Sequence, residues 1–138
     1  MTNIKLFLLF SHSLTPEQRS EASERFGITE CIAMPQELQA AFSSVTPDGE
    51  LDTTLLENLT KWLSDNAVCG DYALIQGEYG VTYYLIEYCF SHDIIPIYAT
   101  TRRECEEHRH ENGVIQKIQH FKHVTFRLYP KYIKGGKR

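Results

Sequence analysis

Short apolar runs alternate with helical segments along the first hundred residues, and this order limits the chain to few folds. Four runs are short enough to be strands buried on both faces of a sheet: 4–10, 28–34, 71–76 and 94–98. Four segments between them have helical character: 16–26, 35–42, 51–68 and 81–91. The order β-α-β-α-α-β-α-β predicts parallel strands, right-handed crossovers and helices on both faces of the sheet.

Proline and glycine positions add local detail. Thr15 is placed as an N-cap, Pro16 takes the first helical position, and Gln18 completes a capping box. Gly27 stands where a glycine commonly ends a helix. Pro96 interrupts the fourth strand, which predicts a bulge there or a position near the sheet edge.

The length of 138 residues fits one domain, and 42% hydrophobic with 23% charged residues favours a folded core. We predict a single Rossmann-like α/β domain over 1–130, with a mostly parallel sheet and a C-terminal β-hairpin extension, and a basic tail at 131–138. No apolar run approaches a membrane span, and residues 1–13 have no cleavage site typical of a signal peptide. The cysteines form no C-x-x-C pair, so reduced thiols and a cytoplasmic location are expected.

The charges divide unevenly along the chain. Residues 1–101 hold 4 Lys and Arg against 14 Asp and Glu, whereas residues 102–138 hold 10 against 4. The basic C-terminal end indicates either an anionic partner for that end or a set of charges that are simply solvated.

A β-hairpin is expected after the fourth strand. Asn112-Gly113 is typical of a two-residue turn, and the segments 104–111 and 114–120 flank it. Three cross-strand pairs follow from such a turn: His110 with Ile115, His108 with Lys117, and Cys105 with His120. Both faces of this ribbon are largely polar, so we expect it to project over a pocket or across a dimer interface. Residues 124–129 alternate again and are predicted to rejoin the sheet as an antiparallel strand.

Ligands of open α/β sheets bind beyond the carboxyl ends of the strands, where the strand order reverses. Four predicted loops lie at those ends: 11–15, 35–36, 77–80 and 99–103. They offer hydroxyls, an imidazole, a glycine-bounded turn into a helix N-terminus, and guanidinium groups. This set suits a phosphodiester better than an apolar ligand.

Each of these features also has a purely structural interpretation. Gly77 and Gly80 can serve the geometry of a turn instead of the approach of a phosphate. The polar residues 11–13 can satisfy backbone groups of their own loop. Arg102 and Arg103 are either a phosphate clamp or a solvated pair.

No metal site is predicted. Cys105 lies near four histidines, which are expected to be exposed residues of the polar hairpin: His108, His110, His120 and His123. The four loops hold no acidic cluster beyond Glu78, which argues against a two-metal nuclease.

Four blocks carry a likeness to a known family: LFLLFSHSLT at 6–15, GDYALIQGEYG at 70–80, IPIYATTRR at 95–103 and FKHVTFR at 121–127. The Ser-His-x-Leu-Thr and Tyr-Ala-Thr-Thr motifs within them are distinctive when found together in this order. The four blocks resemble a family of small stand-alone proteins encoded in type III CRISPR loci, the ring-nuclease-like relatives of the CRISPR-associated Rossmann fold (CARF). The resemblance implies a homodimeric, cytoplasmic protein of antiviral defence that binds cyclic oligoadenylate, the second messenger of type III interference. It also implies that the protein cleaves this ring, with cyclic tetra-adenylate the expected substrate, and so switches the response off.

The resemblance implies three contact loops, with Ser11 and His12 after the first strand, Gln76, Gly77, Glu78 and Gly80 after the third, and Thr100, Thr101 and Arg103 after the fourth. The roles are assigned from the chemistry of these loops and of the residues beside them. Four residues are assigned to catalysis: Ser11, His12, Glu78 and Arg103. Eight are assigned to ligand binding: Ser13, Gln76, Gly77, Tyr79, Gly80, Thr100, Thr101 and Arg102. Successive strand positions point to opposite sides, so we expect Arg103, beside Thr101, to face the crevice in place of Arg102. Glu78 either accepts a hydrogen bond from a ribose 2′-hydroxyl, points to solvent or caps the following helix.

A metal-independent mechanism without a cofactor fits this residue set. A ribose 2′-hydroxyl attacks the adjacent phosphate in line and yields a linear product with a 2′,3′-cyclic phosphate. Two residues are candidates for the general base: His12, and Glu78, which could also orient or deprotonate the 2′-hydroxyl. The alternative is a protein that binds or sequesters the cyclic nucleotide without cutting it. Binding of duplex DNA is not favoured, because no helix-turn-helix motif accompanies the basic end.

Overall fold

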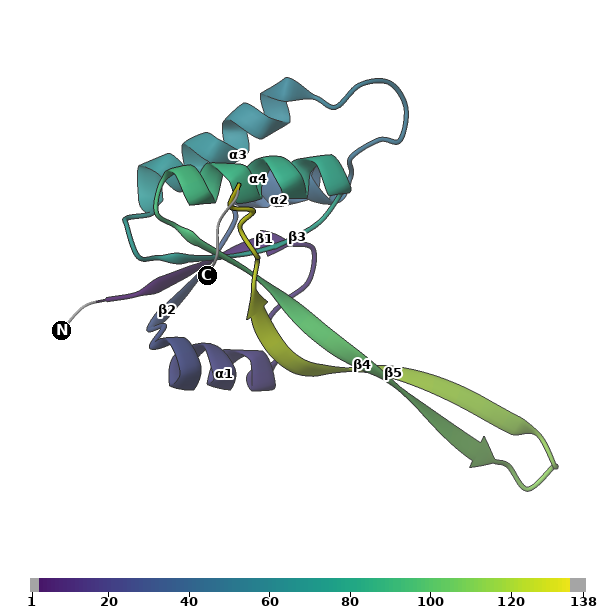
Figure 1. The fold of residues 1–138 in the computed structure, drawn as a ribbon. Helices are drawn as coiled ribbons and strands as arrows, with labels where there is room; N and C mark the ends of the chain where they lie inside the picture. Colours follow the sequence, from purple (N-terminus) through teal and green to yellow (C-terminus); the bar gives the residue numbers. More distant parts are fainter. Residues whose placement is uncertain (1–2, 135–138) are drawn as a thin grey trace.

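The predicted alternation of strands and helices forms in the expected order (Figure 1). The computed structural model describes residues 3–134. Within them the elements are β1 (Lys5–Phe10), α1 (Pro16–Phe26), β2 (Glu30–Ala33), α2 (Gln36–Ser43), α3 (Thr53–Asn66), β3 (Tyr72–Gln76), α4 (Tyr79–Ser91), β4 (Ile95–Arg109) and β5 (Ile115–Leu128).

One five-stranded sheet has the order β2-β1-β3-β4-β5. The strands β1 to β4 are parallel, whereas β5 runs antiparallel to β4, so the sheet is mixed. The chain goes from β1 to β2 on one side and later to β3 and β4 on the other. The strand order therefore reverses between β1 and β3. The α/β class and the mostly parallel sheet are confirmed.

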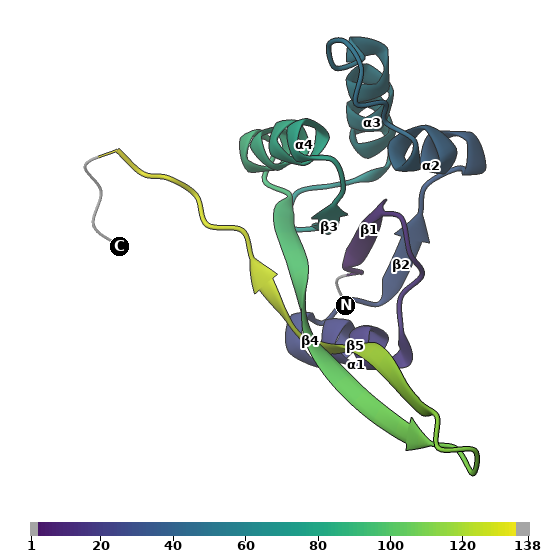
Figure 2. The same cartoon turned by 90° about the vertical axis from the view of Figure 1, so that its right-hand side faces the viewer.

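Helices cover both faces of the sheet (Figure 2): α1 lies on one face, and α2, α3 and α4 lie on the other. Alternate residues of β1 point into these two layers. Phe7 and Leu9 pack on the side of α2 to α4. Leu6 and Leu8 pack on the side of α1. A strand buried on both faces needs an unbroken apolar run, which explains the sequence of β1.

The sequence signals for two helices are confirmed. Thr15 Oγ1 accepts a hydrogen bond from the Gln18 N–H at 3.1 Å, and Gln18 Oε1 accepts one from the Thr15 N–H at 3.0 Å. Gly27 ends α1 with a φ of 70°, a left-handed conformation that glycine adopts without steric cost. In α3, Asp52 accepts from the Thr54 N–H as N-cap. Four leucines of α3 face the core: Leu55, Leu56, Leu59 and Leu63.

Several predicted boundaries differ from the structure by one or a few residues, and those of β2 and α4 bear on the position of the site. The strand β2 covers only residues 30–33 of the predicted 28–34, and it is an edge strand with β1 as its one neighbour. The helix α4 begins at Tyr79 and not at Val81, so Gly80 lies within its first turn.

The predicted bulge at Pro96 is wrong, because the register shift between β4 and β5 lies at Thr100/Thr101. The alternative, a position near the sheet edge, agrees with the structure, because β4 lies next to the edge strand β5. Pro96 is the second residue of the strand, and its carbonyl accepts a hydrogen bond from the Tyr129 N–H at 3.0 Å. Proline is tolerated at such a strand start, where a missing N–H interrupts little of the ladder.

The hairpin strands are much longer than predicted. β4 continues without a break to Arg109, so residues 99–103 lie within a strand and not in a loop. Likewise, β5 joins the predicted second hairpin strand to the predicted strand 124–129. A bulge leaves Val124 without a cross-strand partner, because Thr100 pairs with Thr125 and Thr101 pairs with His123.

The hairpin turn has three residues and not two. The His110 N–H donates to the Val114 carbonyl at 2.9 Å, and Gly113 between them has a φ of 83°. A three-residue loop with a left-handed glycine is another common hairpin turn. It shifts the register by one residue, so that Arg109 faces Ile115. The predicted pairs are therefore wrong: His110 with Ile115, His108 with Lys117, and Cys105 with His120.

The distal part of the hairpin projects from the body of the protein (Figure 1). β3 pairs with β4 only as far as Ile97, and beyond that point β4 and β5 pair with each other. Residues 101–123, named the arm below, are nearly all exposed. The expectation of a polar, projecting ribbon is confirmed.

The predicted tail is described only in part. Residues 131–134 are exposed and form neither helix nor strand, and 135–138 lie outside the described residues. Within residues 3–134, no helix has both the length and the apolar character needed to cross a membrane.

Candidate functional site

A cavity of about 420 Å³ opens beyond the carboxyl ends of β1 and β3, where the strand order reverses. The β1–α1 loop, the first turn of α1, the end of β3 and the base of the arm form its walls. Its lining residues are Phe10, His12, Ser13, Thr15, Gln18, Gln76, Ala99, Thr101 and Phe121. Four predicted site residues are thereby brought together: His12, Ser13, Gln76 and Thr101.

The β1–α1 loop contributes His12 and Ser13, and both side chains are exposed. The His12 imidazole lies edge-on to the ring of Phe10, with 6.3 Å between the ring centroids. Ser11 lines only a neighbouring cavity of about 400 Å³, which His12 and Ser13 also border. Its Oγ accepts a hydrogen bond from Ser43 Oγ at 2.9 Å. Ser11 is therefore held away from the first cavity.

Gln76 is oriented by the neighbouring strand. Its Oε1 accepts a hydrogen bond from the Ala99 N–H at 2.8 Å. Because the amide oxygen is used in this way, the amide nitrogen is the group that Gln76 can present to a ligand, and that nitrogen is a donor.

The predicted site residues of β4 divide between the two faces of the strand. Thr101 lines the cavity, and Arg103 is on the same face because strand residues alternate. Thr100 uses its hydroxyl to donate to the Thr125 carbonyl at 3.0 Å. Arg102 shares the face of Thr100, away from the cavity. This arrangement agrees with the expectation that Arg103 is the residue on the crevice side.

The β3–α4 turn has a structural role. Glu78 is the N-cap of α4, and its Oε1 accepts a hydrogen bond from the Val81 N–H at 2.9 Å. A Cβ atom on Gly77 would lie 2.5 Å from the Phe42 ring. A Cβ atom on Gly80 would lie 3.0 Å from a Leu51 methyl group. Packing and capping thus account for this turn.

None of the four predicted site residues of that turn lines the first cavity: Gly77, Glu78, Tyr79 and Gly80. Tyr79 is 93% exposed at the start of α4. The turn therefore lies beside the cavity and does not form its wall.

A partly buried charge cluster joins α1 to the base of the arm. Glu21 accepts hydrogen bonds from His123 Nε2 at 2.6 Å, from the Thr125 hydroxyl at 2.8 Å and from the Phe126 N–H at 2.9 Å. Arg25 pairs with it at 2.9 Å. Burial alone would raise the pKa of Glu21, but these hydrogen bonds outweigh it and lower the pKa to about 2.

This cluster corrects the prediction that His123 is an exposed hairpin residue, because its side chain is only 5% exposed. The burial of His123 could not be predicted from the sequence, because the bulge at Val124 interrupts the alternation of inward and outward side chains along β5. Phe121 and Gln18 were also not predicted as cavity residues. Gln18 could be recognised only as a helix cap, and Phe121 only as one aromatic residue in a polar ribbon.

Two other histidines of the arm, His108 and His120, pair with a carboxylate, whereas His110 pairs with the Gln116 amide oxygen at 3.1 Å. Glu106 accepts from both His120 and His108 at 3.2 Å, and these hydrogen bonds lower its pKa. Within residues 3–134, no three His, Cys, Asp or Glu side chains are grouped so that they could hold a metal ion.

The cavity is rich in hydrogen-bond donors. Hydroxyls, an imidazole and the amides of Gln18 and Gln76 line it, and no Asp or Glu is among its lining residues. Arg103 adds a positive charge at the base of the arm. A cavity with these properties is suited to an anionic, hydrogen-bonding ligand.

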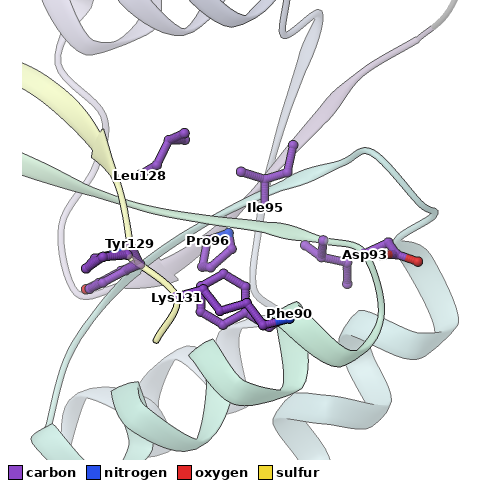
Figure 3. Close-up of a pocket in the computed structure, with 9 residues that line it drawn as sticks. Phe90, Asp93, Ile95, Pro96, Leu128, Tyr129 and Lys131 are labelled. Carbon is purple, nitrogen blue, oxygen red and sulfur yellow. The ribbon is translucent and has the colours of Figure 1, made fainter. Parts of the chain in front are cut away.

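Another cavity, of about 450 Å³, lies near the start of β4 (Figure 3). Phe90, Pro96 and Tyr129 line it together with two charged residues, Asp93 and Lys131. It lies at the end of the sheet opposite the carboxyl ends of the strands. We therefore place the candidate site in the donor-rich cavity.

The sequence profile of the uncharacterized protein MJ1673 family matches residues 4–127. The chain belongs to this family. The "Uncharacterized protein MJ1673" of Methanocaldococcus jannaschii is 38% identical over 128 residues, which is 93% of this chain and 98% of that protein. No solved structure matches the chain. The MJ1673 family profile covers every element of the fold and all of the predicted site residues.

Proposed function

We propose that the protein binds cyclic oligoadenylate, with cyclic tetra-adenylate as the expected ring, and cleaves it to switch off type III CRISPR signalling. The resemblance of four sequence blocks to ring-nuclease-like relatives of the CARF fold supports this proposal. The observation that carries it is the donor-rich cavity, free of lining carboxylates, at the reversal of strand order. A polyphosphate ring is an anionic ligand that needs such donors.

The chemistry needs little from the protein beyond placement and charge stabilisation. A ribose 2′-oxygen forms a bond to the adjacent phosphorus as the bond from phosphorus to the 5′-oxygen breaks. His12 takes the proton of the 2′-hydroxyl as general base, and solvent protonates the leaving 5′-oxygen. Ser13, Thr101 and Arg103 stabilise the charge on the phosphorane. The product is a linear oligoadenylate with a 2′,3′-cyclic phosphate.

The proposal includes a homodimer. A ring with an even number of identical nucleotides has a two-fold axis, and a dimer with the same symmetry presents one equivalent site from each subunit. Each subunit would then cut one phosphodiester.

A second candidate function is sequestration of the ring without cleavage. Two of the four expected catalytic residues have structural partners, since Glu78 caps α4 and Ser11 bonds to Ser43. His12 is then the one expected general base that borders the cavity. This reduced set of catalytic groups is the observation that favours binding alone.

Incubation of the full chain with cyclic tetra- and hexa-adenylate in the presence of a chelator separates these functions. The expected result is linear product with a 2′,3′-cyclic phosphate, identified by chromatography and mass. Intact ring recovered from excess protein would favour sequestration, and activity that requires a divalent ion would contradict the metal-independent step. His12→Ala should lower the single-turnover rate by roughly 10²- to 10⁴-fold without loss of ring binding.

A further inference from the structure

Phe121 is an aromatic side chain at the mouth of the candidate cavity. It lines the cavity together with His12 and Gln76 and is 65% exposed. A large apolar side chain in this position contributes little to the core of the chain, since most of its surface contacts solvent. Its ring is therefore available to a ligand.

Arg103 makes a cation–π contact with the ring of Phe121. The two residues face each other across the β4–β5 ladder, and the Arg103 guanidinium lies over the ring, 5.3 Å from its centroid. The exposed fraction of 65% applies with the guanidinium in place, so much of the ring stays open. Arg103 and Phe121 thus form a stacking surface with a positive charge beside it.

The residues around this stacking surface indicate the chemistry of its ligand. An apolar group would fit the ring but not the donors of Gln76, Ser13 and Thr101 that share the cavity. A heteroaromatic base satisfies both, because its face stacks on an aromatic ring and its edge carries acceptor nitrogens. A phosphate attached to the same nucleotide can pair with the guanidinium.

The geometry points to a nucleobase subsite, in which Phe121 stacks a purine base of the ligand while Arg103 contacts the adjoining phosphate. This inference rests on the proposed function and names residues that select for adenine rings over pyrimidine rings. Purines have the larger stacking surface, and stacking of one base on an aromatic side chain accounts for about 1–3 kcal/mol in other proteins.

The test uses equilibrium titrations of the full chain with cyclic tetra-adenylate. Phe121→Leu should weaken binding roughly 10- to 100-fold. Phe121→Trp should retain it, and the fluorescence of the introduced indole should be quenched by the ring. Tyr83→Leu is the matched control, because Tyr83 is 68% exposed on α4 and does not line the cavity. It should bind as the parent does.

The outcomes separate the subsite from the proposed function. Cyclic tetra-uridylate should bind more weakly than the adenylate ring to the parent, and Phe121→Leu should narrow that difference. If the parent binds cyclic tetra-adenylate tightly and Phe121→Leu binds it equally well, the base subsite is wrong and the proposed function stands. If the folded parent binds no cyclic oligonucleotide, both are wrong. Circular dichroism of each variant shows whether a loss of ring binding is caused by misfolding. If Phe121→Leu is misfolded, the Phe121→Trp titration alone tests the base subsite.

Discussion

At the scale of single residues, Gly77 shows that packing can require a glycine beside a candidate site. A Cβ atom there would lie 2.5 Å from the Phe42 ring, which is closer than carbon atoms approach in proteins. Phe42 is 3% exposed and belongs to the core under α2, α3 and α4, so it has little room to move. The glycine in this turn is therefore explained without a bound phosphate.

We predict that Gly77→Ala lowers the free energy of unfolding by about 1–3 kcal/mol, the usual effect of overpacking. Phe42→Leu makes room for the new methyl group, so the double variant should lose less stability than the sum of the two single losses. Urea titrations of all four proteins measure this coupling. Additive losses would mean that the contact with Phe42 is not what excludes a side chain at position 77.

The two neighbouring arginines of β4 are predicted to differ in function. Arg103 is on the cavity side of the strand with Thr101, whereas Arg102 is on the other face. Arg103→Ala should weaken binding of cyclic tetra-adenylate by about tenfold or more, which is the usual effect of removing a charge-assisted hydrogen bond. Arg102→Ala, as the matched control of equal charge, should weaken it much less. The reverse order in a titration would show that the phosphate contact comes from the other face.

At the scale of elements, Glu21 connects α1 to the last residues of β5 by hydrogen bonds. Its carboxylate accepts from the Phe126 N–H, and it bonds to two side chains of the same strand, His123 and Thr125. The first turn of α1 and the base of the arm both line the candidate cavity. The cluster therefore fixes two walls of the cavity relative to each other.

The depressed pKa of Glu21 predicts how stability depends on pH. Its pKa is about 2 in the folded chain against 4.5 for the free side chain, so the unfolded state binds more protons between these values. The stabilisation is present above pH 4.5 and is lost as the pH falls towards 2. Its full size is about 3 kcal/mol at neutral pH. Glu21→Gln should therefore destabilise the chain at neutral pH and flatten its stability profile below pH 4.5.

Glu24→Gln is the matched control, because Glu24 is an exposed residue of the same helix. It should leave both the neutral stability and the acid profile close to those of the parent. Unfolding curves between pH 2 and 7 give both quantities. An unchanged acid slope in Glu21→Gln would show that other carboxylates cause the acid sensitivity.

The elements with local signals were predictable from the sequence, and those set by long-range pairing were not. The capping box of Thr15 and Gln18 and the leucine stripe of α3 depend on neighbours a few residues away, and both are confirmed. The hairpin register depends on a choice between two turn types that share the Asn112-Gly113 sequence, and the shorter turn was wrong.

The candidate site was likewise predictable where it depends on the order of the elements, and not where it depends on long-range pairing. The reversal of strand order places the β1–α1 loop and Gln76 beside each other, and this follows from the element order alone. The partly buried pair of Glu21 and His123 joins segments about a hundred residues apart, and Phe121 belongs to the second of these segments. Their meeting depends on the length of β5 and on its bulge, for which no local pattern exists.

At the scale of the whole molecule, the arm lacks the support that such a ribbon normally has. An isolated two-stranded hairpin is marginally stable in water, and three strands or a packed helix are usually needed. Nearly every residue of the arm is exposed, including Val114 and Ile115 near its tip at 53% and 50%. A second copy of the chain is a suitable cover, because residues 1–101 are strongly acidic and the arm with the segment after it is basic.

We therefore predict that the full chain forms a dimer through the arm, with twice the monomer mass of 16.0 kDa in sedimentation equilibrium. Ile115→Glu puts a charge at the tip of the arm, and it should shift the chain to the monomer without loss of folded signal in circular dichroism. Val68→Glu, at a site 59% exposed on the body, is the matched control and should stay dimeric. Added salt should also weaken the dimer, since screening reduces the attraction between the acidic residues 1–101 and the basic segment 102–138. A parent that sediments as a monomer at low salt, or a dimer that Ile115→Glu leaves intact, would mean that the arm projects for another purpose.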